Sequence, residues 1–568
     1  MAYLVRDRAG ADGRVRDWEI DAAGRSGAIR RELAAQLPHY MVPAVYVELD
    51  ALPVHATSGK IDAPRLPAPP EQASGHSGDA VTVGAEVTSE ALARLWSAVL
   101  QVDPATIGAD DDFFDLGGHS LGVAELGARV ADAFGVEVTL QQLVARSTLT
   151  DHRRLVAAAR RGEARGEPDV DLCREAVLDD DIVPAADGQR RSLADSEWVL
   201  LTGATGFLGG HLLDRMLRDT RARVACLVRG GDGDAGPAEA RLRASLERRG
   251  LWRTGHEHRL VAIPGDLGRP RLGLADDAFD ELATRVDAVV HAGADVNLVY
   301  PYAALRDVNV DGTREVLRLA CRGGATAVHH VSTNAVLPHA GDPWDEHAPL
   351  DAAAGALADG YSQTKWVAEQ LAHQAAERGL QVQVYRPGTI SGHSATGQAN
   401  ARDLLGAVIV ESLRLGFAPD VDGWFAEMMP VDFVSRALCS LASDPEVGHR
   451  VFHLADPDPL PARALFDRFG RLGYPVRRIG WSDWVELWRE RRARETGVAP
   501  ADVLRGGMPS EDDLRAVPVL DDPVTRPHLH RHGVWRPRID TSLLAAYTRH
   551  FHAEGWLHRP PARTGVSR

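Results

Sequence analysis

Residues Val199–Gly209 read VLLTGATGFLG, and this stretch decides the fold of the larger part of the chain. The apolar run at its start predicts a buried strand, the glycine-rich segment predicts a turn, and a helix follows through Leu217. Glycines let the backbone approach a pyrophosphate, while a helix N-terminus supplies N–H donors and a favourable dipole. The pattern predicts a dinucleotide site built from the turn and the first helical residues, namely Gly203, Thr205, Gly206, Phe207, Leu208 and Gly209.

The strands that follow supply further candidates for this site. The predicted strand Val224–Val228 ends at Arg229, where a guanidinium suits the 2′-phosphate of NADPH. The alternative is that Arg229 is a solvated surface cation. Arg241, on the next predicted helix, could assist it. Two later strand ends should face the cofactor as well, at Asp266-Leu267 and at Ala292.

Candidate catalytic residues come later in the chain. Thr333 follows an apolar strand that ends in Val331-Ser332, and Tyr361-Ser-Gln-Thr-Lys365 opens a predicted helix running to about Gln374. The YxxxK spacing puts phenol and ammonium on one helical face, one turn apart. We expect the ammonium of Lys365 to lower the pKa of Tyr361 from about 10. Tyr361 would then donate a proton to an oxygen that becomes negative as hydride arrives, and Thr333 would hold that oxygen by a hydrogen bond.

Length and composition limit the remaining possibilities. The 568 residues suggest three or four domains, and 44% hydrophobic against 25% charged residues is ordinary for a protein with real cores. The net charge of −16 argues against nucleic acid or anionic lipid as partner. No run is apolar enough to span a membrane, and the first 30 residues are too charged for a signal peptide. Four scattered cysteines form no disulfide framework, which predicts a reducing, cytoplasmic setting.

Only two of the 64 basic residues are lysines, Lys60 and Lys365. Codon bias toward arginine explains the rarity. Under such a bias, a lysine should survive where a planar guanidinium cannot replace a compact, titratable ammonium.

A second motif precedes the dinucleotide stretch. Residues 110–121 read DDDFFDLGGHSL, after a predicted helix with apolar residues on one face. Ser120 would start a helix, and the two glycines before it would leave its hydroxyl accessible to another enzyme. The stretch resembles the attachment motif of a peptidyl or acyl carrier protein, in which the serine at Ser120 bears a 4′-phosphopantetheine arm. The alternative is a helix cap in an unrelated bundle.

The N-terminal piece resembles a different domain. LPHYMVP (Leu37–Pro43) and LPVHATSGKID (Leu52–Asp62) are similar to the end of an adenylation domain of nonribosomal peptide synthetases. In that family the lysine at Lys60 contacts carboxylate and phosphate oxygens during acyl-adenylate formation. The large core that binds ATP and selects the acid does not occur in this sequence, so this piece should not adenylate anything alone. A generic Ser-Gly-Lys loop is the alternative.

The rest of the chain resembles the extended short-chain dehydrogenases, and more narrowly the thioester reductase domains that end some peptide synthetases. The resemblance rests on LTGATGFLG, CLVRG, GDL, VNLVYPY, LRDVNVDGT, VST, YSQTKWVAE, YRPGTISG and MPVDFVSRAL, which span most of residues 172–440. One departure is Ala292, where many relatives carry asparagine after the histidine. A run of histidines at 528–532 predicts a polar loop rather than a metal site.

These resemblances imply a multidomain fold. We expect a small α/β adenylation C-terminal subdomain, a four-helix carrier bundle, and an α/β Rossmann-fold reductase with a mostly helical C-terminal substrate lobe. The corresponding ranges are 1–66 for the subdomain, 67–84 for a linker, 85–160 for the carrier, 161–190 for a second linker, 191–400 for the Rossmann domain and 401–568 for the lobe.

The implied reaction is reductive release of a carrier-bound acyl or peptidyl chain. NADPH would reduce the thioester, Thr333 and Tyr361 would stabilise the negative oxygen, and Lys365 would tune Tyr361 and hold the nicotinamide ribose. The product would be an aldehyde, with further reduction to an alcohol open. The implied partners are a phosphopantetheinyl transferase, an adenylation core and other synthetase modules. Two alternatives remain, a cyclising domain that does not use the nicotinamide and a carrier scaffold that only senses nucleotide.

Overall fold

The computed structural model divides into two compact units, Met1–Pro168 and Asp169–Arg568, which are described separately. It describes residues 2–5, 20, 26, 29, 46–49, 66–67, 86–161, 170–184, 192–230, 235–492, 503–504 and 508–558, apart from gaps at 101, 115, 117, 119, 137, 139, 146, 299, 324–326, 340–341, 358 and 446. Lys60 and most of the predicted linker 67–84 lie outside these residues.

The first unit contains a short sheet and a helical bundle. Strands β1 (Ala2–Val5) and β2 (Tyr46–Leu49) pair in parallel. The described part of the bundle has four α-helices, α2 (Ser89–Leu100), α3 (Ser120–Phe134), α4 (Leu140–Ala145) and α5 (Leu149–Arg160). Their apolar faces bury a core around Trp96 and Phe113, and the Trp96 indole donates to His152 Nδ1 over 3.1 Å. Ser120 is the first residue of α3, as the sequence predicts.

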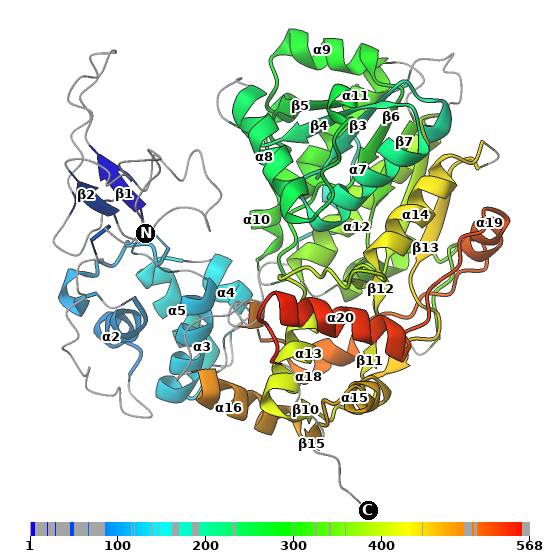
Figure 1. The fold of residues 1–568 in the computed structure, drawn as a ribbon. Helices are drawn as coiled ribbons and strands as arrows, with labels where there is room; N and C mark the ends of the chain where they lie inside the picture. The colour runs from blue at the N-terminus through cyan, green and yellow to red at the C-terminus, as the bar shows by residue number, and fades with distance from the viewer. Residues whose placement is uncertain are drawn as a thin grey trace, which may run out of the picture. The chain divides into compact units, whose positions relative to one another are not determined.

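The second unit is built on a parallel sheet, as expected for a Rossmann fold. Seven of the described strands pair in the order β13-β8-β7-β6-β3-β4-β5 (Figure 1). The order reverses direction between β3 and β6, so that these neighbours form the switch point at which such sheets bind ligands. The strands are β3 (Trp198–Thr202), β4 (Arg223–Val228), β5 (Leu260–Pro264), β6 (Ala288–His291), β7 (Ala327–Val331), β8 (Gln381–Pro387) and β13 (Arg450–Leu454).

Alternate side chains of each strand enter two separate cores. Leu200 packs into the core shared with one set of helices, whereas Val199 and Leu201 pack into the other. Both faces of the sheet are covered, so its strands are mostly apolar, although buried polar residues such as His330, Gln383 and Arg386 also occur in them. The first set is α9 (Asp276–Arg285), α11 (Gly312–Gly323) and α12 (Gly360–Glu377), and the second is α7 (Phe207–Asp219), α8 (Ala235–Arg248) and α14 (Val431–Ala442).

The C-terminal part adds an aromatic core of its own, which includes Trp424, Phe469, Trp484 and Phe551. Its helices are α13 (Leu404–Leu415), α15 (Ala462–Arg471), α16 (Trp481–Arg492), α18 (Glu511–Arg515), α19 (Thr525–Arg531) and α20 (Thr541–Ala553). Short strands connect them, namely β10 (Phe417–Pro419), β11 (Phe425–Ala426), β12 (Met429–Pro430), β14 (Leu460–Pro461) and β15 (Arg477–Ile479).

The C-terminal part differs from the sequence-based expectation in one domain boundary and in the structure of the histidine run. Strand β13 lies beyond residue 400, yet it completes the edge of the Rossmann sheet beside β8, so the range 401–568 is not a separate lobe throughout. The histidine run does not form a loop, because α19 contains most of it. Among the described residues no group of three potential ligands is placed to hold a metal ion. No described helix is both long and apolar enough to cross a bilayer.

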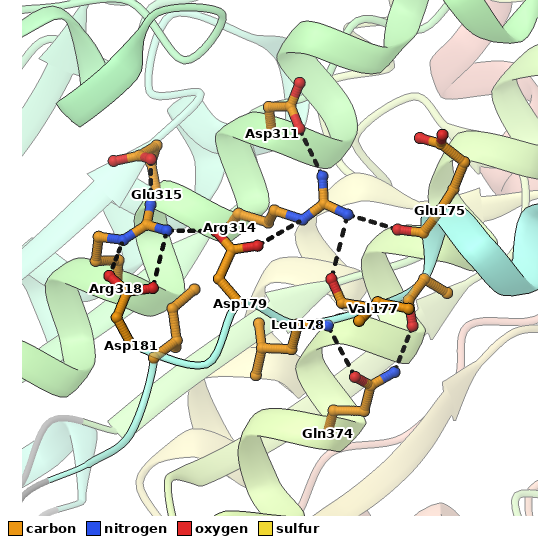
Figure 2. A network of polar contacts seen from close by, with 12 residues as sticks. Glu175, Val177, Leu178, Asp179, Asp181, Asp311, Arg314, Glu315, Arg318 and Gln374 are labelled. Carbon is orange, nitrogen blue, oxygen red and sulfur yellow. Dashed lines mark hydrogen bonds and ion pairs between the residues drawn. The ribbon is translucent and has the colours of Figure 1, made fainter.

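Residues 170–184 fall in the range predicted as a linker, but they pack on the second unit. Leu172, Leu178 and Ile182 are buried in the core beneath α11 and α12. Figure 2 shows the polar contacts that hold this segment, which includes α6 (Leu172–Glu175). Arg314 and Arg318 of α11 bind its carboxylates and carbonyls, and Gln374 of α12 both donates to the Ala176 carbonyl and accepts from the Leu178 N–H. The segment therefore belongs to the folded second unit.

Candidate active site

The glycine-rich turn after β3 forms a cradle that only glycine can line. Gly203 has φ +76°, and a methyl group on it would come within 2.7 Å of the Ala292 carbonyl oxygen. A methyl group on Gly209 would lie 2.0 Å from the Gly203 carbonyl oxygen. Helix α7 starts immediately afterwards, and its N-cap Gly206 makes no side-chain capping bond. A close turn followed by an uncapped helix N-terminus fits the pyrophosphate of a dinucleotide.

A buried hydrogen-bond chain ties β3 to β6 beneath this cradle. Thr202 Oγ1 lies 2.8 Å from His291 Nδ1 and accepts from the Gly293 N–H over 2.9 Å. The other imidazole nitrogen lies 3.1 Å from Thr313 Oγ1. Burial, with the nearby charge of Lys365, lowers the pKa of His291 to about 3. His291 is therefore a neutral bridge that fixes the adjoining Ala292-Gly293 backbone against Gly203.

The residues predicted to bind the adenosine half lie at neighbouring strand ends. Arg229 follows β4 and is exposed, and Arg241 of α8 donates to its backbone carbonyl over 3.2 Å. Asp266 follows β5 and accepts from the Gly268 N–H through its side chain. A methyl group on Gly293 would come within 2.5 Å of the Leu267 side chain. The structure thus gathers these side chains at the carboxyl edge of β4, β5 and β6.

The three candidate catalytic residues converge beside β7. Thr333 follows this strand, and Tyr361 and Lys365 lie one turn apart near the start of α12. The Thr333 side chain is close enough to the Tyr361 phenol to affect its pKa, and its hydroxyl donates to Asn334 Oδ1 over 3.2 Å. Lys365 is only 3% exposed, and its Nζ donates to the Val331 carbonyl over 2.8 Å. The Lys365 ammonium is therefore held between the end of β7 and the body of α12.

The pKa of Tyr361 departs from the sequence-based expectation. Burial raises it to about 12, with Asp359 adding to the rise and the Thr333 side chain opposing it. The expected lowering by Lys365 is not found: burial dominates the pKa of Tyr361, and Lys365 is not among the groups that shift it. The Lys365 ammonium instead donates to the Val331 carbonyl. Tyr361 is therefore a neutral phenol at physiological pH, ready to donate its proton.

Lys365 itself is tuned by a buried ion pair that sequence reasoning missed. Burial lowers the pKa of Lys365 to about 8, and the carboxylate of Glu369 opposes this fall. Glu369 is fully buried, accepts two bonds from the Arg386 guanidinium at 2.5 and 2.9 Å, and accepts a further bond from the Ser332 hydroxyl. The i,i+4 spacing from Lys365 to Glu369 was the available signal.

Comparisons with known proteins agree with this site. The NAD-binding family model described as male sterility protein matches residues 201–438, and the model described as phosphopantetheine attachment site matches residues 90–152. The solved structure of the terminal R domain from the myxalamid PKS-NRPS pathway is 36% identical in sequence to this chain. The match covers 69% of this chain and 100% of that domain, with a TM-score of 0.63. The chain belongs to the terminal reductase family of nonribosomal peptide synthetases.

Two further comparisons cover more of the chain. Glycine betaine reductase ATRR of Emericella nidulans is 48% identical over 99% of this chain, which spans 45% of that protein's length. A thiolation-reductase di-domain from an archaeal non-ribosomal peptide synthetase has the same fold over 84% of this chain and 99% of its own, at 21% identity and a TM-score of 0.64. In this chain the phosphopantetheine-attachment match at residues 90–152 precedes the NAD-binding match at residues 201–438.

Proposed function

We propose that the protein releases a carrier-bound acyl chain by NADPH-dependent reduction of its thioester to an aldehyde. Addition of hydride and a proton to the carbonyl would give a hemithioacetal, whose C–S bond then breaks to leave the aldehyde and the free thiol of the carrier arm. The observation that carries the proposal is the placement of Thr333, Tyr361 and Lys365 at the end of β7 and the start of α12, two strands away from the glycine cradle after β3. A scaffold that only senses nucleotide would not need a phenol, a hydroxyl and an ammonium gathered there.

The side chains act on the thioester oxygen, which gains negative charge as hydride arrives. Tyr361 stays protonated at physiological pH because its pKa is raised to about 12, so it donates a proton to that oxygen. The Thr333 hydroxyl donates a second hydrogen bond to the same oxygen. Lys365 remains charged below about pH 8, and its positive charge would stabilise the thioester oxygen as that oxygen becomes negative.

NADPH, when bound, supplies the hydride. Gly203, Gly206 and Gly209 would take its pyrophosphate, with Thr205, Phe207 and Leu208 in the same turn and helix start. Arg229, assisted by Arg241, would bind the 2′-phosphate. Asp266, Leu267 and Ala292 would border the adenosine half and the dinucleotide, and Lys365 would hold the nicotinamide ribose.

The substrate would arrive on a 4′-phosphopantetheine arm at Ser120, attached by a phosphopantetheinyl transferase. An adenylation core acting with Lys60, and other synthetase modules, would supply the acyl group. A glycine betaine thioester is the first to test, because the relative that is 48% identical over 99% of this chain is named for that substrate. The four free cysteines support a cytoplasmic setting.

The test uses the full chain, loaded by a phosphopantetheinyl transferase from the coenzyme A thioesters of acetate, glycine and glycine betaine. We expect one NADPH to be oxidised per aldehyde released. The fall in absorbance at the nicotinamide band measures NADPH oxidation, and mass spectrometry of the trapped aldehyde measures the product. Chain release without NADPH oxidation would refute the proposal and favour a cyclising or hydrolytic domain.

A further inference from the structure

The carboxylate of Glu427 lies against the carboxyl ends of three neighbouring strands of the sheet. Glu427 stands between β11 and β12, outside the sheet. Its oxygens accept from Asn334 Nδ2 over 3.0 Å, from the Thr389 N–H over 3.1 Å and from the Asp456 N–H over 3.0 Å. These three donors follow β7, β8 and β13, which are adjacent in the sheet. One side chain thus joins three loops at the edge where Thr333 stands.

The hydrogen-bond donors around Glu427 suit an ionised carboxylate, whereas its burial disfavours the charge. Glu427 is 4% exposed, and a methyl group on Gly388 would come within 1.9 Å of its Oε1. All three of its described hydrogen-bond partners are N–H donors, whereas a protonated carboxyl or an amide would bring a donor of its own. Replacing Glu427 by glutamine would therefore place an amide N–H group against at least one of these N–H donors, which would lose its acceptor.

Asn334 transmits this arrangement to Thr333. Because its Nδ2 donates to Glu427, its Oδ1 faces the other way and accepts from the Thr333 hydroxyl over 3.2 Å. This bond, together with the bond that Thr333 Oγ1 accepts from the Ala335 N–H over 3.3 Å, holds the Thr333 hydroxyl near the Tyr361 phenol. A negative substrate oxygen is a stronger acceptor than a neutral amide oxygen, so it would take over the Thr333 proton as charge develops.

We propose that Glu427 is a positioning residue for thioester reduction, which through Asn334 holds the Thr333 hydroxyl where the negative oxygen forms. The inference rests on the proposed function and adds to it a residue that touches neither thioester nor cofactor. A residue of this kind should change kcat and leave the KM for NADPH unaltered, because Glu427 makes no contact with the glycine cradle among its described bonds.

The arrangement also predicts how activity depends on pH. Burial raises the pKa of Glu427 to about 7, the like charge of Asp456 adds to the rise, and the Thr389 and Asp456 N–H groups and the charge of Arg536 oppose it. Asp456 in turn faces Arg536, Asp458 and Asp522. As pH falls through about 7, Glu427 takes up a proton and its hold on Asn334 weakens. The kcat of the parent should therefore fall below pH 7.

The test compares kcat and KM from pH 5.5 to 8.5 in the full chain, carrying whichever acyl group of the panel turns over fastest. We expect Glu427→Gln to lower kcat at pH 8 about 10-fold or more and to leave the KM for NADPH unchanged. The acid limb, which is the fall of kcat below pH 7, should be absent from this variant. Glu411→Gln is the matched control, since Glu411 is a buried carboxylate of α13 bonded to Trp488, and it should keep the parent profile. Asn334→Ala should lower kcat to a similar extent as Glu427→Gln. The variant that carries both substitutions should have a kcat no lower than that of Asn334→Ala.

Three results would count against the inference. If the parent is active but shows no acid limb near pH 7, the inference is wrong, and this result needs no variant to fold. Equal losses in Glu427→Gln and Glu411→Gln, or multiplicative losses in the double variant, would also overturn it. A loaded parent that oxidises no NADPH at any pH would instead refute the proposed function, and the inference with it.

Discussion

Replacing Lys365 with arginine keeps the positive charge but changes its shape, which makes it the sharpest perturbation of the site. The ammonium is 3% exposed and donates to the Val331 carbonyl over 2.8 Å, with Tyr361 and Glu369 one turn away on either side. A planar guanidinium is larger and presents its donors in a fixed fork. It cannot occupy the same space without moving β7 or α12.

The expected loss follows from the contacts of Lys365. A hydrogen bond to a charged group contributes about 1.5–3 kcal/mol, or roughly 10- to 150-fold in rate, and acid–base assistance adds about 10²-fold or more. We expect Lys365→Arg to lower kcat/KM by about 10²-fold or more. Because burial lowers the pKa of Lys365 to about 8, the charge is present below this pH and lost above it. The kcat/KM of the parent for NADPH should fall above pH 8, and Lys365→Met should lose this basic limb.

The assay follows NADPH oxidation by the loaded chain, after each variant has been shown to fold and to bind NADPH. Lys60→Arg is the matched control, because it makes the same change at the other lysine, whose adenylate chemistry a preloaded carrier does not need. Near-normal turnover by Lys365→Arg would refute the reasoning. A large loss in Lys60→Arg would show that the N-terminal piece takes part in reduction.

Three further predictions concern the arm, the cofactor and the buried ion pair. Ser120, the first residue of α3, should gain one phosphopantetheine mass with coenzyme A and a transferase, whereas Ser120→Ala should gain none; an arm mapped to another residue would contradict this. Arg229→Ala should lower kcat/KM for NADPH roughly 10- to 150-fold and leave NADH nearly unchanged, and equal use of both cofactors by the parent would exclude the assignment. Glu369→Gln should lower the free energy of unfolding by about 3–5 kcal/mol, because Arg386 is 1% exposed and would lose its buried partner; denaturant titration measures this, and an unchanged midpoint would rule it out.

The parts of the fold that depend on local spacing could be predicted from the sequence. The strand, turn and helix around Gly203 follow from one short stretch, and the helix that carries Tyr361 and Lys365 follows from another. The start of α3 at Ser120 is of the same kind. In each case the residues that define the element are neighbours in the chain, so their pattern is visible without knowledge of the packing.

Features that depend on contacts between distant residues could not be predicted. Asn334 and Glu427 are 93 residues apart, and no local pattern joins them. The raised pKa of Tyr361 reflects how much protein surrounds the phenol, and burial of this kind is not visible in the spacing of a motif. Strand β13 joins the sheet only because the chain returns to β8 after the intervening helices, which is why the range 401–568 was assigned wholly to a lobe.

The most direct test of the central claim is to follow the hydride itself. NADPH that carries deuterium in place of the transferred hydrogen at C4 of the nicotinamide is mixed with the loaded full chain. The released product is trapped, and its mass is measured by mass spectrometry. Reductive release predicts an aldehyde one mass unit heavier than that formed with ordinary NADPH, with the deuterium on the former thioester carbon and one labelled NADPH consumed per product. An unlabelled product, or an acid or cyclised chain released at full yield without NADPH, would contradict the account.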